Sequence, residues 1–432
     1  MTVRTMARTG VIGLAAAAVA VTAFTAPAQA DSGSGAPKSQ RHQGVQQAMD
    51  DLVKAGIPGV IAQLRTGDRV WNGTSGVADL QTGKPRRADE RYRIASITKT
   101  FVATVLLDQE ADGVLSLDDT VEHWLPGVVQ GNGNDGRKIT VRQLLDHTSG
   151  LFEYMGDPGY RKKFFTKEYL QSRYETWTPL QTVKVGLAHQ PDFAPGARHQ
   201  YSNTGYVLAG MIIEKASGNS YAHEVRKRIL KPLGMRNTTL PGNSVTMPNP
   251  HSKAYSVLSD DPDATEYFDV TEQNGSQAFA DGDIISTTGD VNRFFRALLG
   301  GRLLPAAQLK AMKTMHPNAG PVAGYTEYGL GLYSYRTSCG VKVWGHSGGA
   351  SGALSETVAT EDGRRTLSVN VNADWNWSPA IVESAFCGAK TAKATKAGKA
   401  VKAGKAVKAG KATKAGKAND SNKAGKAGPI AR

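Results

Sequence analysis

The sequence predicts an α/β (α+β) fold in which one antiparallel sheet, built from both chain ends and flanked by helices, accompanies an inserted, mostly helical subdomain. Residues 59–77 and residues 341–371 both contain short β-patterned runs separated by turns, at Thr66-Gly67-Asp68 and at Asp362-Gly363. The residues between these regions carry helical patterns. Strands at both ends of a helical middle imply that the two ends pair in one sheet. We expect a cleft between this sheet and the inserted subdomain.

Local patterns give approximate bounds for each element. Strands are expected at residues 59–65, 69–77, 341–344, 354–360 and 367–371. Helices are expected at residues 45–55, 100–112, 141–146, 205–216, 221–230 and 291–299. The apolar residues at 367, 369 and 371 alternate with polar ones, which indicates a strand with one solvated face. Residues 152–200 and 240–282 are expected to form long loops that line the cleft.

The N-terminus has the features of a secretory signal peptide. Arg4 and Arg8 precede the apolar run 11–24, and Ala28-Gln29-Ala30 provides a cleavage site of the small-x-small type. We therefore expect residues 1–30 to be removed from an exported protein, with an uncleaved anchor as the alternative. No later stretch reaches about 18 apolar residues, so no transmembrane span is expected in the mature form.

The positive charge is concentrated at the two ends of the chain. Of the formal net charge of +14, residues 1–30 contribute +2 and residues 389–432 contribute +12. Residues 31–388 therefore carry no net charge. Nucleic acid is therefore not expected as a partner of the folded part. Residues 31–43, rich in Ser, Gly and Pro, are expected to form a flexible lead before a folded domain at residues 44–388.

Residues 389–432 form a basic tail rich in Lys, Ala and Gly. Lysine recurs at every third position from Lys390 to Lys417. Because such a segment has few large apolar side chains to bury, we expect it to be disordered. Because the signal peptide predicts a secreted, extracellular protein, anionic cell-wall polymers are the expected partner of this tail, which would retain the protein on the cell wall. A merely solubilising tail is the alternative.

The chain has two cysteines, Cys339 and Cys387, which both lie near the end of the folded part. Export favours a disulfide between them, which would tie the end of the domain to a strand. Two free buried thiols are the alternative.

Ser96 and Lys99 lie three residues apart where a buried helix is expected to begin. An apolar stripe that starts at Phe101 and ends at Gly113 indicates this helix. A serine hydroxyl needs a base within hydrogen-bond reach to act as a nucleophile, and Lys99 lies one turn away. Burial and the positive end of the helix dipole both favour the neutral amine that a base must be. The alternative is a serine at a helix start beside a lysine that faces solvent.

Two further motifs contain groups suited to acyl transfer. In Tyr201-Ser202-Asn203, the phenol can pass protons and the amide can hold a substrate carbonyl. In His346-Ser347-Gly348-Gly349, small residues at the end of a strand let a substrate approach closely. The backbone N–H groups of Ser96 and Gly349 would then form an oxyanion hole. A helix-capping asparagine and a surface histidine are the respective alternatives.

The motifs Ser-x-x-Lys, Tyr-x-Asn and His-x-Gly, in this order, resemble the arrangement of the penicillin-recognising serine enzymes. The resemblance covers about residues 45–388 and is greatest to the secreted serine D-alanyl-D-alanine carboxypeptidases that group with class C β-lactamases and family S12 peptidases. Further segments similar to that group are residues 139–144, 147–151, 328–332, 338–340 and 383–388. The resemblance implies a β-lactamase/transpeptidase-like fold and a serine hydrolase domain that needs no metal and no organic cofactor.

The resemblance also implies a role for each motif residue. Ser96 would be acylated, Lys99 would take its proton, and Tyr201 would deliver that proton to the departing amine. Asn203 would orient the substrate amide. His346 would stand where related enzymes place a lysine.

The implied carboxylate subsite departs from the carboxypeptidase pattern. Ser347 would lie beside the substrate carboxylate, but Gly349 lacks the hydroxyl that those enzymes carry at its position. Tyr333 stands where the close relatives carry a carboxylate-binding arginine. A free carboxylate would therefore lose a partner worth about 1.5–3 kcal/mol, unless Arg336 or another cation replaces it.

The leading hypothesis is a secreted serine-type D-Ala-D-Ala carboxypeptidase that acts through an acyl-enzyme. Its expected ligands are peptidoglycan-type D-Ala peptides or related small acyl substrates, and β-lactams that acylate the serine. The lost carboxylate contacts favour three alternatives within the enzyme class, namely an esterase, a β-lactamase and a D-amino-acid amidase. A slowly deacylating penicillin-binding sensor and a wall-adhesion protein are alternatives from other classes.

Overall fold

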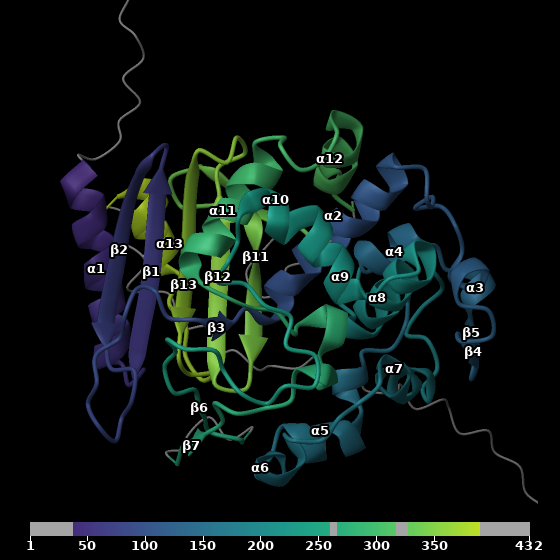
Figure 1. Cartoon of the computed structure of the whole chain (residues 1–432), viewed down its shortest axis with the longest axis horizontal. Helices are drawn as coiled ribbons and strands as arrows, with labels where there is room; N and C mark the ends of the chain where they lie inside the picture. The colour runs from purple at the N-terminus through teal and green to yellow at the C-terminus, as the bar shows by residue number, and fades with distance from the viewer. Residues whose placement is uncertain (1–37, 260–265, 317–326, 389–432) are drawn as a thin grey trace, which may run out of the picture. The chain divides into compact units, whose positions relative to one another are not determined.

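The structure is a computed structural model that describes residues 38–259, 266–316 and 327–388 (Figure 1). The predicted signal peptide at residues 1–30 and the predicted basic tail at residues 389–432 lie outside the described residues. Within the described ranges, no helix has the length and apolar character needed to span a membrane.

A seven-stranded antiparallel sheet organises the described part of the chain, with the strand order β2-β1-β13-β12-β11-β10-β9 (Figure 1). Its strands are β1 (Gly59–Thr66), β2 (Arg69–Gly76), β9 (Glu327–Tyr328), β10 (Tyr333–Arg336), β11 (Lys342–Ala350), β12 (Ala353–Ala359) and β13 (Arg365–Val371). The first strand pairs with the last, so that Val60 lies opposite Val371 and Leu64 lies opposite Leu367. This register confirms that both chain ends build one sheet.

Helices cover both faces of this sheet (Figure 1). The helices on one face are α1 (Lys38–Lys54) and α13 (Ala380–Cys387). On the other face α11 (Thr288–Leu299) contacts β1, β12 and β13, while α2 (Thr98–Ala111) and α8 (Asn203–Ser217) pack against each other in the same hydrophobic core. Val60 and Val343 belong to the hydrophobic cluster on the side of α1 and α13. Their neighbours Ile61 and Trp344 belong to the cluster on the side of α2 and α11. The sheet therefore divides the core in two, because successive strand residues face opposite sides.

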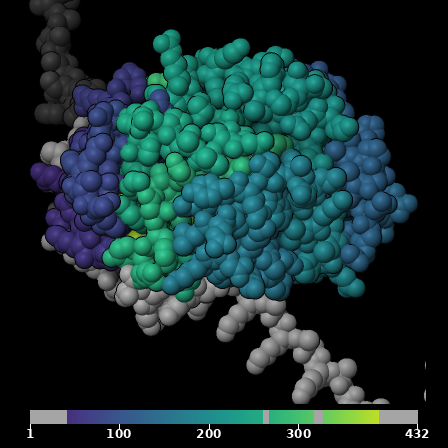
Figure 2. Space-filling view, turned by 60° about the horizontal axis from the view of Figure 1, so that its bottom comes forward, coloured from purple at the N-terminus to yellow at the C-terminus, as the bar shows by residue number. Residues whose placement is uncertain are grey.

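The predicted helical subdomain follows α2. Its helices are α3 (Val121–Trp124), α4 (Val141–Leu145), α5 (Pro158–Phe164), α6 (Tyr169–Ser172), α7 (Pro179–Leu187), α8, α9 (Tyr221–Val225) and α10 (Lys231–Leu233), and α12 (Ala306–Lys313) follows α11. Short strand pairs are β3 (Tyr92–Arg93) with β8 (Ile285–Ser286), β4 (Gln130–Gly131) with β5 (Asn134–Asp135), and β6 (Tyr255–Ser256) with β7 (Phe268–Asp269). Figure 2 shows the subdomain, in blue and teal, beside the green segment that follows it.

The prediction of a long loop at residues 152–200 was wrong, because the region contains α5, α6 and α7. These helices are short, but their start signals are in the sequence. Asp157 caps α5, which has Pro158 at its first position. Thr178 and Gln181 form a capping box at the start of α7.

Two other boundaries also differ from the predictions. The expected flexible lead at residues 31–43 overlaps α1, which begins at Lys38, because the Ser-, Gly- and Pro-rich composition ends at Pro37. The helix expected at residues 221–230 is regular only to Val225 and continues as a π-helical turn, Arg226–Leu230. The proline that follows this turn lacks an N–H group and crowds the preceding turn, which explains the local loosening.

Candidate active site

Ser96 lies where a short 3-10 turn runs into a buried helix. The turn spans Ala95–Ile97 and continues directly into α2, so Lys99 stands in the first turn of that helix. The Lys99 Nζ atom lies 3.0 Å from Ser96 Oγ. Ala95 has a φ of 48°, a left-handed conformation that non-glycine residues rarely adopt and that is found at functional turns. The structure therefore brings the predicted serine and lysine into contact.

The Lys99 side chain is fully buried and has three hydrogen-bond partners. Besides Ser96, Nζ contacts Asn203 Oδ1 at 2.6 Å and the backbone carbonyl oxygen of Asp281 at 2.7 Å. Burial lowers the pKa of Lys99 to about 8, while the carboxyl groups of Asp281 and Glu153 oppose this shift. The amine is therefore partly neutral near pH 8, and in that state Nζ can accept the Ser96 proton.

Asn203 is the first residue of α8, and Glu153 holds it in place. The Glu153 carboxylate accepts hydrogen bonds from the Asn203 backbone N–H and from Nδ2, the latter at 3.1 Å. These bonds turn Oδ1 toward Lys99. Burial raises the pKa of Glu153, and the hydrogen bonds from Asn203 oppose the rise.

A second buried carboxyl group near Lys99 belongs to Asp281. The Tyr154 hydroxyl donates to Asp281 Oδ2 at 2.8 Å. Burial raises the pKa of Asp281 to about 7, and the positive charge of Lys99 opposes the rise. Sequence reasoning missed Glu153, Tyr154 and Asp281, because they lie in segments expected to be loops and belong to none of the three motifs. Their signal is weak, since it consists only of acidic residues among aromatic ones.

Tyr201 lies beside Lys99, with its ring centroid 5.0 Å from Nζ. The buried His147 ring packs against it at 4.1 Å between centroids. His147 Nδ1 accepts a hydrogen bond from the Ser202 backbone N–H at 3.1 Å, which holds the chain next to Tyr201. Burial keeps the pKa of His147 well below its ordinary value, so the imidazole is neutral.

His346, on β11, is buried and neutral. Its Nδ1 donates to the Ser347 carbonyl oxygen at 2.6 Å, and its Nε2 accepts from the Tyr328 hydroxyl at 2.9 Å. A carbonyl oxygen can only accept, so the two contacts fix this tautomer. Burial lowers the pKa of His346 to about 3, and the charge of Lys99 adds to the effect. The His346 ring lies 6.4 Å from the Tyr201 ring and so joins the site without carrying a charge.

The end of β11 that carries the third motif projects beyond β10, which pairs with β11 only as far as Gly345. Gly348 packs directly on the residue before the Ser96 turn, because a Cβ at this position would lie 2.1 Å from the Ile94 carbonyl oxygen. The neighbouring Gly349 is exposed. An oxyanion hole made of the N–H groups of Ser96 and Gly349 stays a prediction, and this close packing is compatible with it.

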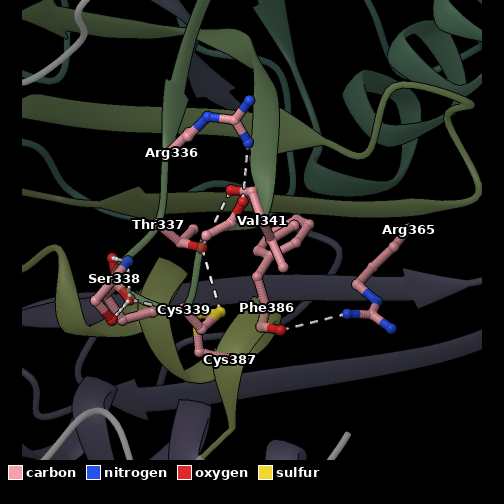
Figure 3. Close-up of a disulfide and its surroundings, with 10 residues drawn as sticks. Arg336, Thr337, Ser338, Cys339, Val341, Arg365, Phe386 and Cys387 are labelled. Atoms are coloured by element: carbon pink, nitrogen blue, oxygen red, sulfur yellow. Dashed lines mark hydrogen bonds between the residues drawn. A yellow bond between two sulfur atoms is a disulfide. The ribbon is translucent and has the colours of Figure 1, made fainter. Parts of the chain in front are cut away.

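Ser347 points to the face of β11 opposite His346, because alternate strand residues face opposite sides. Its hydroxyl is hydrogen-bonded to Tyr333. Arg336 does not take the place of the missing arginine. It lies at the far end of β10, where it donates to the Gly340 carbonyl oxygen at 3.1 Å (Figure 3).

His199 is a further buried histidine near the site, and it packs against neighbouring rings. The His199 ring lies 5.7 Å from the His147 ring and 5.6 Å from the Tyr328 ring. Burial lowers the pKa of His199 to about 4, so this imidazole is also neutral. Among the residues with described positions, no three His, Cys, Asp or Glu side chains are grouped so that they could hold a metal ion.

The predicted disulfide is confirmed. Cys339 and Cys387 are bonded, with their Cα atoms 5.7 Å apart (Figure 3). The bond joins the turn after β10 to the end of α13, and so ties the end of the domain to the sheet.

Comparisons with known proteins agree with this architecture. Residues 45–376 match the family model described as Beta-lactamase. The chain is 50% identical to a D-stereospecific amidohydrolase from Streptomyces sp., with a TM-score of 0.75 over 80% of this chain and 98% of that chain. It is 30% identical to the D-amino acid amidase from Ochrobactrum anthropi SV3 complexed with L-phenylalanine amide, with a TM-score of 0.69 over 82% of this chain and 99% of that chain.

A third relative is penicillin-binding protein 4* of Bacillus subtilis, which is 30% identical over 342 residues, or 76% of this chain and 71% of that protein. The matched residues 45–376 include all three motifs and the whole seven-stranded sheet. The chain therefore belongs to the β-lactamase family of serine hydrolases.

Proposed function

We propose that this chain hydrolyses amides of D-amino acids, with Ser96 as the nucleophile. The observation that carries the proposal is the 3.0 Å contact between Ser96 Oγ and the Nζ atom of the buried Lys99, whose lowered pKa suits a general base. The likeness to a D-stereospecific amidohydrolase and to a D-amino acid amidase supports the substrate class.

In the proposed acylation, Ser96 Oγ attacks the carbonyl carbon of the amide, and its proton passes to Lys99 Nζ. The N–H groups of Ser96 and Gly349 hold the oxyanion that forms. The C–N bond then breaks, and Tyr201 relays the proton from Lys99 to the departing nitrogen, which leaves as ammonia or an amine. Water next attacks the Ser96 ester, gives up a proton along the reverse path, and releases the D-amino acid while the serine hydroxyl is restored.

The site favours this reaction over D-Ala-D-Ala carboxypeptidase activity. Tyr333 stands where the carboxypeptidases carry the carboxylate-binding arginine, and Arg336 lies at the far end of β10. A terminal carboxylate would therefore lose the charge-assisted partner worth about 1.5–3 kcal/mol. The amidase alternative fits these residues better than the leading carboxypeptidase hypothesis.

The test measures kcat/KM for D-phenylalanine amide, L-phenylalanine amide and a D-Ala-D-Ala peptide, with the wild type and Ser96→Ala. We expect the D-amide to be preferred over both other substrates. Ser96→Ala should abolish all hydrolysis while keeping the circular dichroism spectrum. It should also lack the mass increase that we expect for the wild type after incubation with a penicillin.

Three other outcomes of this test would contradict the proposal. Equal rates for the two enantiomers would contradict the proposed stereospecificity. A preference for the peptide would favour the carboxypeptidase hypothesis. A stable penicillin adduct without turnover of any substrate would indicate a slowly deacylating sensor.

We also propose that the chain is exported and held on the cell wall by its basic tail. The signal-like residues 1–30 and the charge of +12 in residues 389–432 support this location. Cell fractionation should find the full chain in the wall fraction and release it with salt, because salt screens such attraction. A chain lacking residues 389–432 should appear in the medium with unchanged kcat/KM. Wall retention of the truncated chain would contradict the proposal.

A further inference from the structure

Glu356 belongs to a hydrogen-bond network that the proposed mechanism does not use. It lies on β12 directly opposite Ser347 on β11, so the two side chains share one face of the sheet. The Tyr333 hydroxyl donates to Glu356 Oε1 at 2.8 Å, and the Tyr335 hydroxyl donates to the same oxygen at 3.1 Å. Two phenols thus hold one carboxyl group beside the third motif.

This network reaches the active site through Tyr333 and Ser347. The Tyr333 ring lies 5.5 Å from the ring of His346. The Ser347 hydroxyl is hydrogen-bonded to Tyr333 and is half-buried, whereas Glu356 is 9% exposed. The hydroxyl groups of Tyr333 and Ser347 therefore form a hydrogen-bonded path between Glu356 and the third motif.

Among the described residues, the Glu356 carboxyl group has phenols rather than cations as its partners. In the described part of the chain its hydrogen bonds come from Tyr333 and Tyr335, and no basic side chain shifts its pKa. Burial raises the pKa of Glu356, and the two phenols oppose the rise. The two phenol donors stabilise the ionised form of Glu356. An anionic group brought to Ser347 would then add a second negative charge to a partly buried place, where charges are screened less than in water.

We propose that Glu356, held by Tyr333 and Tyr335, excludes carboxylates from the leaving-group side of the active site. The leaving group of a substrate must then be neutral or cationic at the end that meets Ser347. This inference rests on the proposed amidase function and names the class of leaving group that the same site accepts. Glu356 acts here on specificity and does not touch the reacting carbonyl carbon.

The first test uses two peptides that differ only in their terminal group, D-Phe-D-Ala-NH2 and D-Phe-D-Ala with a free carboxylate. We expect kcat/KM of the wild type to favour the amide by roughly tenfold to a hundredfold, the range expected for one poorly screened like charge. Glu356→Gln keeps the size of the side chain and an acceptor for the phenols. It should lower this preference by about tenfold.

The matched control is Glu383→Gln. Glu383 is equally exposed at 9%, lies on α13 and accepts a hydrogen bond from the Ser338 hydroxyl. Its substitution should leave the preference unchanged. A wild-type preference near one would overturn the inference. So would a preference that Glu356→Gln does not alter or that Glu383→Gln lowers equally.

A second assay separates this inference from the amidase proposal, because it requires no amide turnover. It measures, by mass spectrometry, how fast Ser96 is acylated by benzylpenicillin and by its uncharged methyl ester. The ester should react faster in the wild type, and the difference should shrink in Glu356→Gln. If neither peptide is hydrolysed but this Glu356-dependent difference appears, the amidase proposal fails and the inference stands.

The two assays also identify the case in which the amidase proposal holds but the inference does not. If the peptides are hydrolysed but neither pair is discriminated, the inference fails and the amidase proposal stands. Wild-type ratios near one in both assays would overturn the inference even if Glu356→Gln did not fold.

Discussion

Lys99 should give the enzyme an activity that rises between pH 7 and pH 9. If Lys99 is the base, acylation requires its neutral form, and burial lowers its pKa from 10.5 to about 8. At pH 7 this raises the neutral fraction from about 0.03% to about 9%, a gain of about 300-fold or about 3 kcal/mol. A still lower pKa of Lys99 would raise its neutral fraction at pH 7 by at most about a further tenfold.

Asp281→Asn should provide part of that gain. The Asp281 carboxylate raises the pKa of Lys99, so its removal lowers this pKa and moves the midpoint of the pH profile to lower pH. The substitution changes charge with little change in contacts. Lys99 bonds the backbone carbonyl of Asp281, and asparagine can still accept from the Tyr154 hydroxyl.

The assay follows acylation by benzylpenicillin methyl ester, which has no titrating group between pH 6 and pH 10. Asp283→Asn is the matched control, because Asp283 is also buried with a raised pKa but is hydrogen-bonded to Tyr221 rather than placed at Lys99. Its midpoint should equal that of the wild type. A midpoint in Asp281→Asn that stays in place or moves to higher pH would refute the electrostatic reasoning. A wild-type profile without a rise between pH 7 and pH 9 would refute Lys99 as the base.

Two further predictions concern stability. Gly348→Ala should lower the free energy of unfolding by about 1–3 kcal/mol, because the new Cβ would lie 2.1 Å from the Ile94 carbonyl oxygen. Thermal unfolding measures this, with Gly349→Ala as the control, since its nearest neighbour is a side-chain atom at 3.3 Å. Replacing Cys339 and Cys387 with serine should cost up to about 4 kcal/mol, because the disulfide spans 48 residues. Urea unfolding measures this cost, and an unchanged midpoint would contradict the prediction.

Local spacing was sufficient to predict the parts of the site that lie close together in sequence. The separation of Ser96 and Lys99 by three residues at a helix start placed them in one turn, and their atoms are in contact. Glu153 and Asp281 could not be predicted in this way. They act on Lys99 through burial and charge, and the contact between Lys99 and Asp281 joins residues 182 positions apart. Only the packing of the subdomain on α2 brings such groups together.

The neutrality of His346 links the base to the proposed choice of substrate. Lys99 already lowers the pKa of His346, so two positive charges in this desolvated place oppose each other. A lysine at position 346 would compete with Lys99 for protonation, whereas an imidazole that accepts from Tyr328 stays uncharged. The site then keeps one titrating amine, whose pKa is set by burial and by the nearby carboxyl groups of Glu153 and Asp281. The neutral His346 ring also provides no attraction for a substrate carboxylate. The single titration of Lys99 and the proposed preference for an uncharged leaving group therefore have the same electrostatic cause, which is the lack of charge at His346.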